Sequence, residues 1–121
     1  MADEIKATVS INVENGTYKT TFNPGELSID QTTQGAASGI LSIGTTEETV
    51  SFTDVSSEGV AVFQNLDATN FINVGPDSTG IQNFLKIKAG EHCFLRLHPG
   101  ITVKAKADTA ACKMYFLVLE D

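Results

Sequence analysis

Hydrophobic and polar residues alternate strictly near the start of the chain. Between residues 5 and 13 every odd position is apolar and every even position is polar. Alternation of this kind places the apolar side chains on one face of an extended strand. Asn15-Gly16 then supplies the left-handed backbone conformations that a tight hairpin turn needs, and residues rich in Thr and aromatics follow. The pattern predicts a β-hairpin over residues 5–23.

The rest of the chain is a series of short apolar runs separated by turn residues. The predicted strands lie in GILSIG, ETVSFTDV, GVAVFQNL, FINV, FLKIK, HCFLRLH, ITVKAKA and CKMYFLVLE. Residues 28–40, SIDQTTQGAASGI, have no sustained period and are predicted to form a loop or an irregular edge segment. No window shows the spacing of an amphipathic helix. About nine or ten short strands predict an all-β protein, an antiparallel β-sandwich of jelly-roll-like type without substantial helix.

The length and uniformity of the chain predict a single β-sandwich domain over residues 1–121. A chain of 121 residues is near the usual size of one domain and can bury a core without help from disulfides or metal. No repeat, linker or low-complexity segment divides it.

Acidic residues dominate the charge of the chain. Fifteen acidic residues against eight basic residues give a net charge of -7, which repels nucleic acid and anionic membrane surfaces. No apolar segment approaches the roughly 20 residues that span a bilayer, and the first residues lack the basic and apolar parts of a secretory signal. We therefore expect a soluble protein made in the cytoplasm, with neither nucleic acid nor membrane as a partner.

Residues 86–100 gather both histidines of the chain and one of its two cysteines. On an extended strand His92, Arg96 and His98 face one way and Cys93 faces the other, so a Cys–His nucleophilic pair is not expected. The α-carbons of the two histidines would be about 20 Å apart at the usual rise per residue, too far for one ion. A metal site would need further ligands from other strands. We interpret this segment as one wall of a β-sheet.

Other candidates for chemistry have structural explanations. Without an export signal, Cys93 and Cys112 are predicted to be small buried side chains and not a disulfide. Residues 75–80, GPDSTG, lack the lysine of a phosphate-binding loop. Four residues could supply oxygen ligands to calcium, although turn formation explains them better: Asp67, Asn70, Asn73 and Asp77. No pair of carboxylates forms an acid–base couple, so we expect no enzymatic activity, no cofactor and no metal.

The last apolar run breaks the alternation. Phe116, Leu117, Val118 and Leu119 put bulky side chains on both faces of one strand, whereas antiparallel sandwich strands usually keep one face polar. Two explanations stay open. Either the strand is central and covered by a loop such as residues 31–40, or one face is buried by another subunit. These four residues are therefore the candidate interface.

The second half of the chain, residues 63–121, has a distinctive order of segments. A strand ending in NLDATN leads to an apolar strand and a GPDSTG turn, followed by LKIKAGE, an FLRL strand, AKADTAA and an apolar strand ending in LED. In this order and spacing it resembles small β-rich virion structural proteins of tailed bacteriophages. The resemblance assigns no role to His92 or His98.

This resemblance implies a non-enzymatic virion protein that acts through protein contacts. We expect a capsid decoration, or cement, protein that binds the lattice of the major capsid protein or other virion structural proteins. It is expected to form a homo-oligomer, with a trimer as one option. A neck, tail or head-fibre component is the alternative. A sugar-binding adhesion module is less favoured, because the chain has no Trp and only Tyr18 and Tyr115 as tyrosines. A cupin-like metalloenzyme would need more than two histidines.

Overall fold

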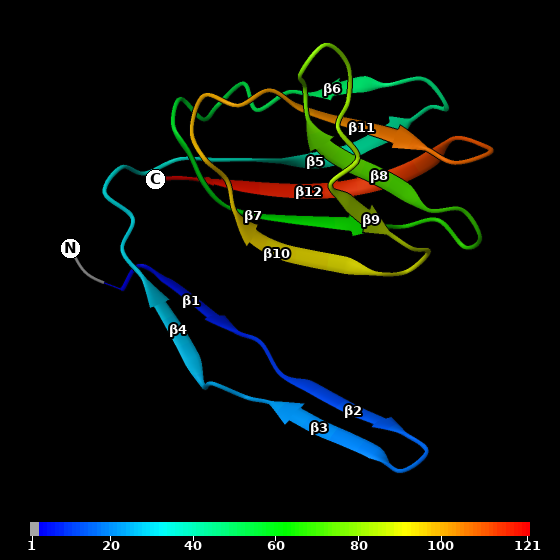
Figure 1. The fold of residues 1–121 in the computed structure, drawn as a ribbon. Coiled ribbons are helices and arrows are strands. Elements are labelled where there is room, and N and C mark those ends of the chain that lie inside the picture. Colours follow the sequence, from blue (N-terminus) through cyan, green and yellow to red (C-terminus); the bar gives the residue numbers. More distant parts are fainter. Residues whose placement is uncertain (1–2) are drawn as a thin grey trace. The chain divides into compact units, whose positions relative to one another are not determined.

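The computed structural model describes residues 3–121, and every regular element among them is a β-strand (Figure 1). The strands belong to two compact units, one ending at Thr33 and one comprising Gln34–Asp121. The prediction of an all-β sandwich without substantial helix is confirmed. Within the described residues, no helix long and apolar enough to cross a membrane is found.

The first unit is a two-stranded ribbon built from two antiparallel ladders. Strand β1 (Ile5–Thr8) pairs with β4 (Glu26–Ile29), and β2 (Ile11–Asn15) pairs with β3 (Tyr18–Phe22). Gly16 occupies the tip with a φ of 61°, the left-handed conformation expected for the Asn-Gly turn. The predicted hairpin is confirmed. It continues beyond Pro24-Gly25, because β4 resumes the pairing with β1.

The second unit is a sandwich of two four-stranded antiparallel sheets. One has the strand order β10-β7-β12-β5 and is called the β12 sheet; the other has the order β6-β11-β8-β9 and is called the β11 sheet (Figure 1). The strands are β5 (Ala36–Ile43), β6 (Glu48–Val50), β7 (Glu58–Asn65), β8 (Ile72–Pro76), β9 (Leu85–Ile87), β10 (His92–Arg96), β11 (Val103–Ala107) and β12 (Cys112–Glu120). Apart from the β8–β9 connection, the chain changes sheet at each step. This is the eight-stranded, double-sheet arrangement of a jelly roll.

The core of the sandwich lies between the inner faces of the two sheets. Met114, Phe116 and Val118 alternate along β12 toward the inside, with exposed fractions of 0%, 6% and 0%. They belong to one buried cluster with Phe63 from β7 and Ile72 from β8. The period of two therefore places every second residue of β12 in the core.

The prediction of a loop or an irregular edge segment over residues 28–40 is wrong at both ends, because Ser28 and Ile29 belong to β4 and the last five residues belong to a regular edge strand, β5. Residues 36–40 form the first part of β5, and Ala36–Gly39 lie opposite Phe116–Leu119 in the ladder with β12. Ala, Ser and Gly give this strand no hydrophobic period, but the backbone pairing with β12 does not depend on one. Because the segment pairs along the edge of β12, it does not cover either face of that strand.

The jelly roll is made entirely from residues 36–120. The strands of the first unit pair only with each other among the described residues. The sequence interpretation that residues 1–121 fold as one domain stays a prediction.

Candidate functional site

Strand β10 arranges His92 and Cys93 as the sequence predicted. His92 and Arg96 are exposed, whereas Cys93 is half-buried and packs against the core with Leu95. His98 lies beyond the end of the strand, where its Nδ1 is 3.0 Å from the carbonyl oxygen of Pro99. His92 and Cys93 thus face opposite ways, as predicted, and β10 is the wall of a sheet, whereas His98 lies outside the strand and lines the cavity between the two sheets.

The two thiols have the properties of core side chains. Cys93 and Cys112 are both free cysteines. Burial raises the pKa of each thiol, and the carboxylates of Asp67 and Asp108 raise that of Cys112 further. A nucleophilic cysteine needs the opposite shift, because the thiolate is the reactive form. The arrangement therefore provides no activated sulfur.

The NLDATN segment is a turn held by its own side chains. Asp67 Oδ2 accepts hydrogen bonds from the backbone N–H groups of Asn70 (2.7 Å) and Thr69 (3.0 Å), and these bonds lower the pKa of Asp67. The fully buried Asn65 donates from Nδ2 to the carbonyl oxygens of Asn70 (2.8 Å) and Ile87 (2.9 Å). The Asn65 amide therefore links the turn to β9, and the Asp67 carboxylate stabilises the turn by accepting hydrogen bonds from its backbone.

The other proposed oxygen ligands also have structural partners. Asp77 accepts a hydrogen bond from the N–H of Gly80 at 3.0 Å, and its Oδ2 lies 3.8 Å from Lys104 Nζ. Asn73 lies on β8, opposite Lys106 of β11. Within residues 3–121, no three His, Cys, Asp or Glu side chains gather in the way that a metal ion requires.

One buried carboxylate joins distant parts of the sandwich. Glu120, at the end of β12, is 5% exposed. Its Oε1 accepts the N–H of Ser56 at 3.1 Å, and its Oε2 accepts the N–H of Ser57 at 2.6 Å and the Oγ–H of Ser56 at 3.2 Å. These hydrogen bonds, with the Ser56 N–H contributing most, lower the pKa of Glu120. The group acts as a hydrogen-bond acceptor that fixes the β6–β7 loop.

This carboxylate predicts a loss of stability in acid. A carboxyl whose pKa is lowered in the folded state contributes stability above its unfolded pKa, about 4.3 for Glu. That contribution disappears as the pH falls through the lowered folded pKa. We expect the free energy of unfolding, measured by urea titration, to fall between about pH 5 and pH 3, and to fall less steeply in Glu120→Gln. Equal pH slopes for the two proteins would contradict this role.

The four candidate interface residues divide according to the face on which they lie. Phe116 and Val118 are buried in the core, and the Phe116 ring packs against Phe52 with 5.8 Å between centroids. In the folded chain these two residues are therefore not accessible to another subunit. Leu117 and Leu119 lie on the outer face of the β12 sheet and are half-buried, so they remain interface candidates.

The register shows that further apolar residues surround these two leucines. Leu117 lies between Ser38 of β5 and Val62 of β7, and Val62 lies opposite Phe94 of β10. On β5, Ile40 lies opposite Tyr115 and is 61% exposed. We call this set the apolar face: Ile40, Val62, Phe94, Tyr115, Leu117 and Leu119.

Sequence reasoning missed four of the six residues of the apolar face, Tyr115 among them. Val62, Phe94 and Ile40 are separated from Leu117 in the sequence and come together only through strand pairing. The available signal was the alternation of side chains between the two faces of each strand, but this alternation does not say which strands are neighbours.

The outer face of the β11 sheet is different. It carries Lys104 and Lys106 from β11 and Lys86 from β9. Lys104 Nζ pairs with Glu47 Oε1 at 3.0 Å, and Lys86 Nζ lies 4.3 Å from the centroid of the Phe71 ring. A polar outer face of this kind is normal for a sandwich in water. The outer face of the β12 sheet is more apolar, although Ser38 and Gln64 lie among its apolar residues.

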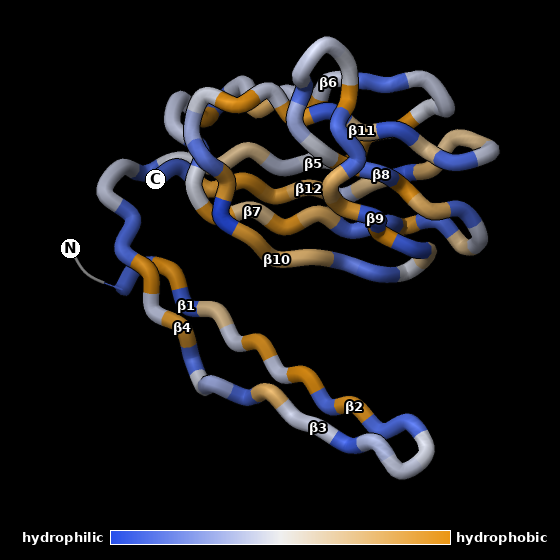
Figure 2. The backbone as a smooth tube through the Cα atoms, viewed as in Figure 1, coloured by the Kyte–Doolittle hydropathy of each residue, from blue (hydrophilic) through white to orange (hydrophobic). Residues whose placement is uncertain are grey.

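The ribbon of the first unit also exposes apolar side chains. Figure 2 shows hydrophobic residues alternating with hydrophilic ones along β1 and β2. Ile11 lies opposite Phe22, with exposed fractions of 49% and 55%, and Leu27 of β4 is 49% exposed. An isolated two-stranded hairpin is at best marginally stable in water. The ribbon therefore presents side chains that a further surface would stabilise.

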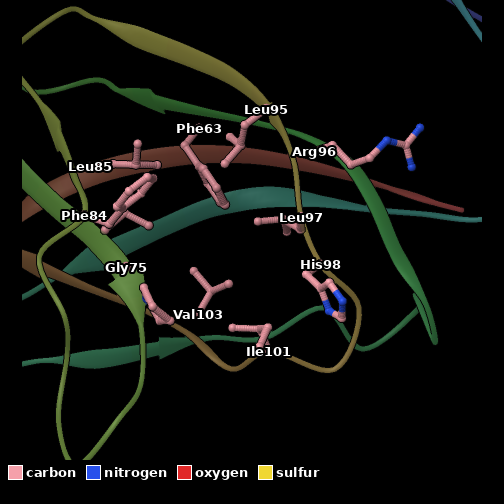
Figure 3. A pocket seen from close by; sticks show the side chains of 12 residues that line it. Phe63, Gly75, Phe84, Leu85, Leu95, Arg96, Leu97, His98, Ile101 and Val103 are labelled. Carbon is pink, nitrogen blue, oxygen red and sulfur yellow. The ribbon is translucent and has the colours of Figure 1, made fainter.

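An apolar cavity of about 270 Å³ opens between the two sheets of the sandwich (Figure 3). Leu95 and Leu97 line it from one side and Leu85 and Val103 from the other, while the guanidinium of Arg96 points away. Arg96 instead pairs with Asp121 at 3.1 Å. The cavity can accept an apolar group, and its lining, which includes His98, contains no carboxylate.

We compared the chain with protein-family profiles, with curated proteins and with solved structures, and none of these comparisons found a match.

Proposed function

We propose that this protein is a non-enzymatic structural subunit of a virus particle, a decoration protein that binds the lattice of the major capsid protein. The apolar face of the β12 sheet carries the proposal. It combines the exposed Ile40 with the half-buried Tyr115, Leu117 and Leu119 on one side of a rigid sheet. Residues of this kind are expected to face a partner and not water.

The layout of the apolar face is that of a protein contact. Burial of apolar surface favours association, and aromatic residues are enriched at the centre of interfaces. Charged residues lie toward the margin of the face: Lys113 is opposite Ser42, and Arg96 pairs with Asp121. An apolar centre with a polar rim is the usual anatomy of an interface.

Two further features support a partner within a virus particle. The order of segments in residues 63–121 resembles that of small virion structural proteins of tailed bacteriophages. The net charge of -7 would complement a basic patch on a capsid protein. The jelly roll is used by capsid proteins, lectins and cupins alike, so the fold is compatible with this function without specifying it.

The ribbon supplies a second surface for assembly. Its ladder β2–β3 is exposed along nearly its whole length, and Tyr18 is 62% exposed. An extended ribbon of this type can lie along a neighbouring subunit and gain the burial that its own two strands lack.

The copy number of the chain in purified particles tests the proposal. We expect near-stoichiometric amounts relative to the major capsid subunit, measured by quantitative mass spectrometry. A few copies per particle would contradict decoration and favour a neck, tail or head-fibre position. Absence from particles would overturn the virion role altogether.

A further inference from the structure

Strand β5 is an edge strand with an open side. It pairs with β12 along one edge and stands at the end of the sheet. Residues 36–43 form no backbone hydrogen bond to any other described element. In an edge strand, alternate residues direct their N–H and C=O groups outward, where they can accept another strand.

The other sheet edges of the sandwich are protected in ways that β5 is not. Strands β6 and β9 are three residues long and contain Glu48 and Lys86, and β10 contains Arg96. In contrast, β5 is eight residues long, with the sequence AASGILSI and neither a charged residue nor proline. Long, uncharged edges are those at which sheets extend by pairing with another chain.

We propose that β5 pairs antiparallel with β5 of a second copy, joining two β12 sheets into one continuous eight-stranded sheet across a two-fold axis. A two-fold axis makes the contact self-complementary, so each copy satisfies the outward backbone groups of the other. The inference concerns self-association and holds whether or not the partner of the apolar face is a capsid protein.

The pleat limits the register of this pairing. Residues that lie opposite each other must point to the same face, so Ile40 must face an outward residue of the second copy. Two registers then pair most of the strand. In the first, the two-fold axis passes through Gly39 and Ile40 lies opposite Ser38 of the second copy. In the second, the axis passes through Ile40, which lies opposite Ile40 of the second copy. Neither register places charged side chains against each other, and the large pair that the second register creates, Ile40 with Ile40, is an apolar contact.

The choice of a second copy as occupant follows from charge and from the neighbouring surface. Two chains of net charge -7 repel each other, and β5 is a strand where they can approach without opposing carboxylates. Pairing there also brings the two apolar faces side by side, because Ile40 and Tyr115 of each copy lie next to the joint. The result is a doubled apolar face on one side of a continuous sheet.

Sedimentation of the full chain over a range of concentrations tests the inference. We expect a monomer–dimer equilibrium for the wild type and at least a tenfold weaker dimer for Ile40→Lys, since the new lysines are adjacent across the joint in both registers. Ile40 is exposed, so the substitution is compatible with the fold. Leu117→Lys, on β12 and away from the edge, is the matched control and is expected to retain the dimer.

Hydrogen exchange of the backbone separates edge pairing from association through the apolar face. Amides in residues 36–43 should gain protection as the wild-type concentration rises, and should not do so in Ile40→Lys. A wild type that stays monomeric at high concentration would overturn the inference, as would a dimer that Leu117→Lys abolishes and Ile40→Lys preserves. Copy number in particles is a separate measurement, so failure here leaves the proposed function standing.

Discussion

Replacement of Gly75 by alanine is expected to destabilise the jelly roll by at least about 3 kcal/mol. A Cβ atom at this position would overlap the carbonyl oxygen of Gln82 and lie 2.8 Å from its carbonyl carbon. The obstacle is backbone, which moves far less easily than the end of a side chain. The β8–β9 connection must therefore shift away from β8 if any side chain is present.

The shift would break the hydrogen bonds that hold this connection in place. Gln82 donates its N–H to the carbonyl of Pro76 at 2.9 Å, and Phe84 donates to the carbonyl of Val74 at 3.3 Å. Urea unfolding monitored by circular dichroism measures the loss. Gly39→Ala is the control, because its nearest neighbour is the Phe116 ring at an ordinary 3.5 Å. If the two variants have the same free energy of unfolding, the β8–β9 connection moves freely and the prediction is wrong.

Lysine at adjacent positions of β12 is expected to have opposite consequences. Val118→Lys should unfold the jelly roll, with a loss of about 4 kcal/mol or more, because a fully buried position would receive an unpaired charge. Leu117→Lys should cost only about 1 kcal/mol, because this residue points outward and a lysine can extend its ammonium into water. The period of two along the strand separates the two outcomes.

The folded Leu117→Lys variant then tests the apolar face. We expect it to bind stripped particles at least tenfold more weakly than the wild type, because a charge would have to be desolvated at the centre of the contact. Thr49→Lys, on the exposed part of the β11 sheet, is the matched control and should bind normally. Normal binding by Leu117→Lys would remove the apolar face from the contact, and unfolding of Leu117→Lys would show that this residue belongs to the core.

Local features of the chain were predictable because they depend on neighbouring residues. The alternation over residues 5–13 and the Asn15-Gly16 turn define a hairpin without reference to the rest of the chain. The same argument placed Cys93 and His92 on opposite sides of β10, but it failed for His98, which lies beyond the end of that strand. Where the local pattern was weak, as over Ala36–Gly39, it failed, because β5 owes its conformation to pairing with β12.

The candidate site required information that no local pattern holds. The sequence singled out residues 116–119 as apolar on both faces, which is correct as a description of β12. Only the packing of the two sheets showed that Phe116 and Val118 fill the core while Leu117 and Leu119 face outward. A period of two separates the faces of a strand but does not say which face is inside.

By itself, the sequence determined the strand content, the hairpin turn, the opposition of Cys93 to His92 and the unusual character of β12. Those properties follow from backbone preferences and from alternation along single strands. Only the tertiary structure decided the strand order, the collection of Ile40, Val62 and Phe94 around Leu117, and the open edge of β5. Each of these depends on pairing between segments distant in the chain, which burial of the whole core selects.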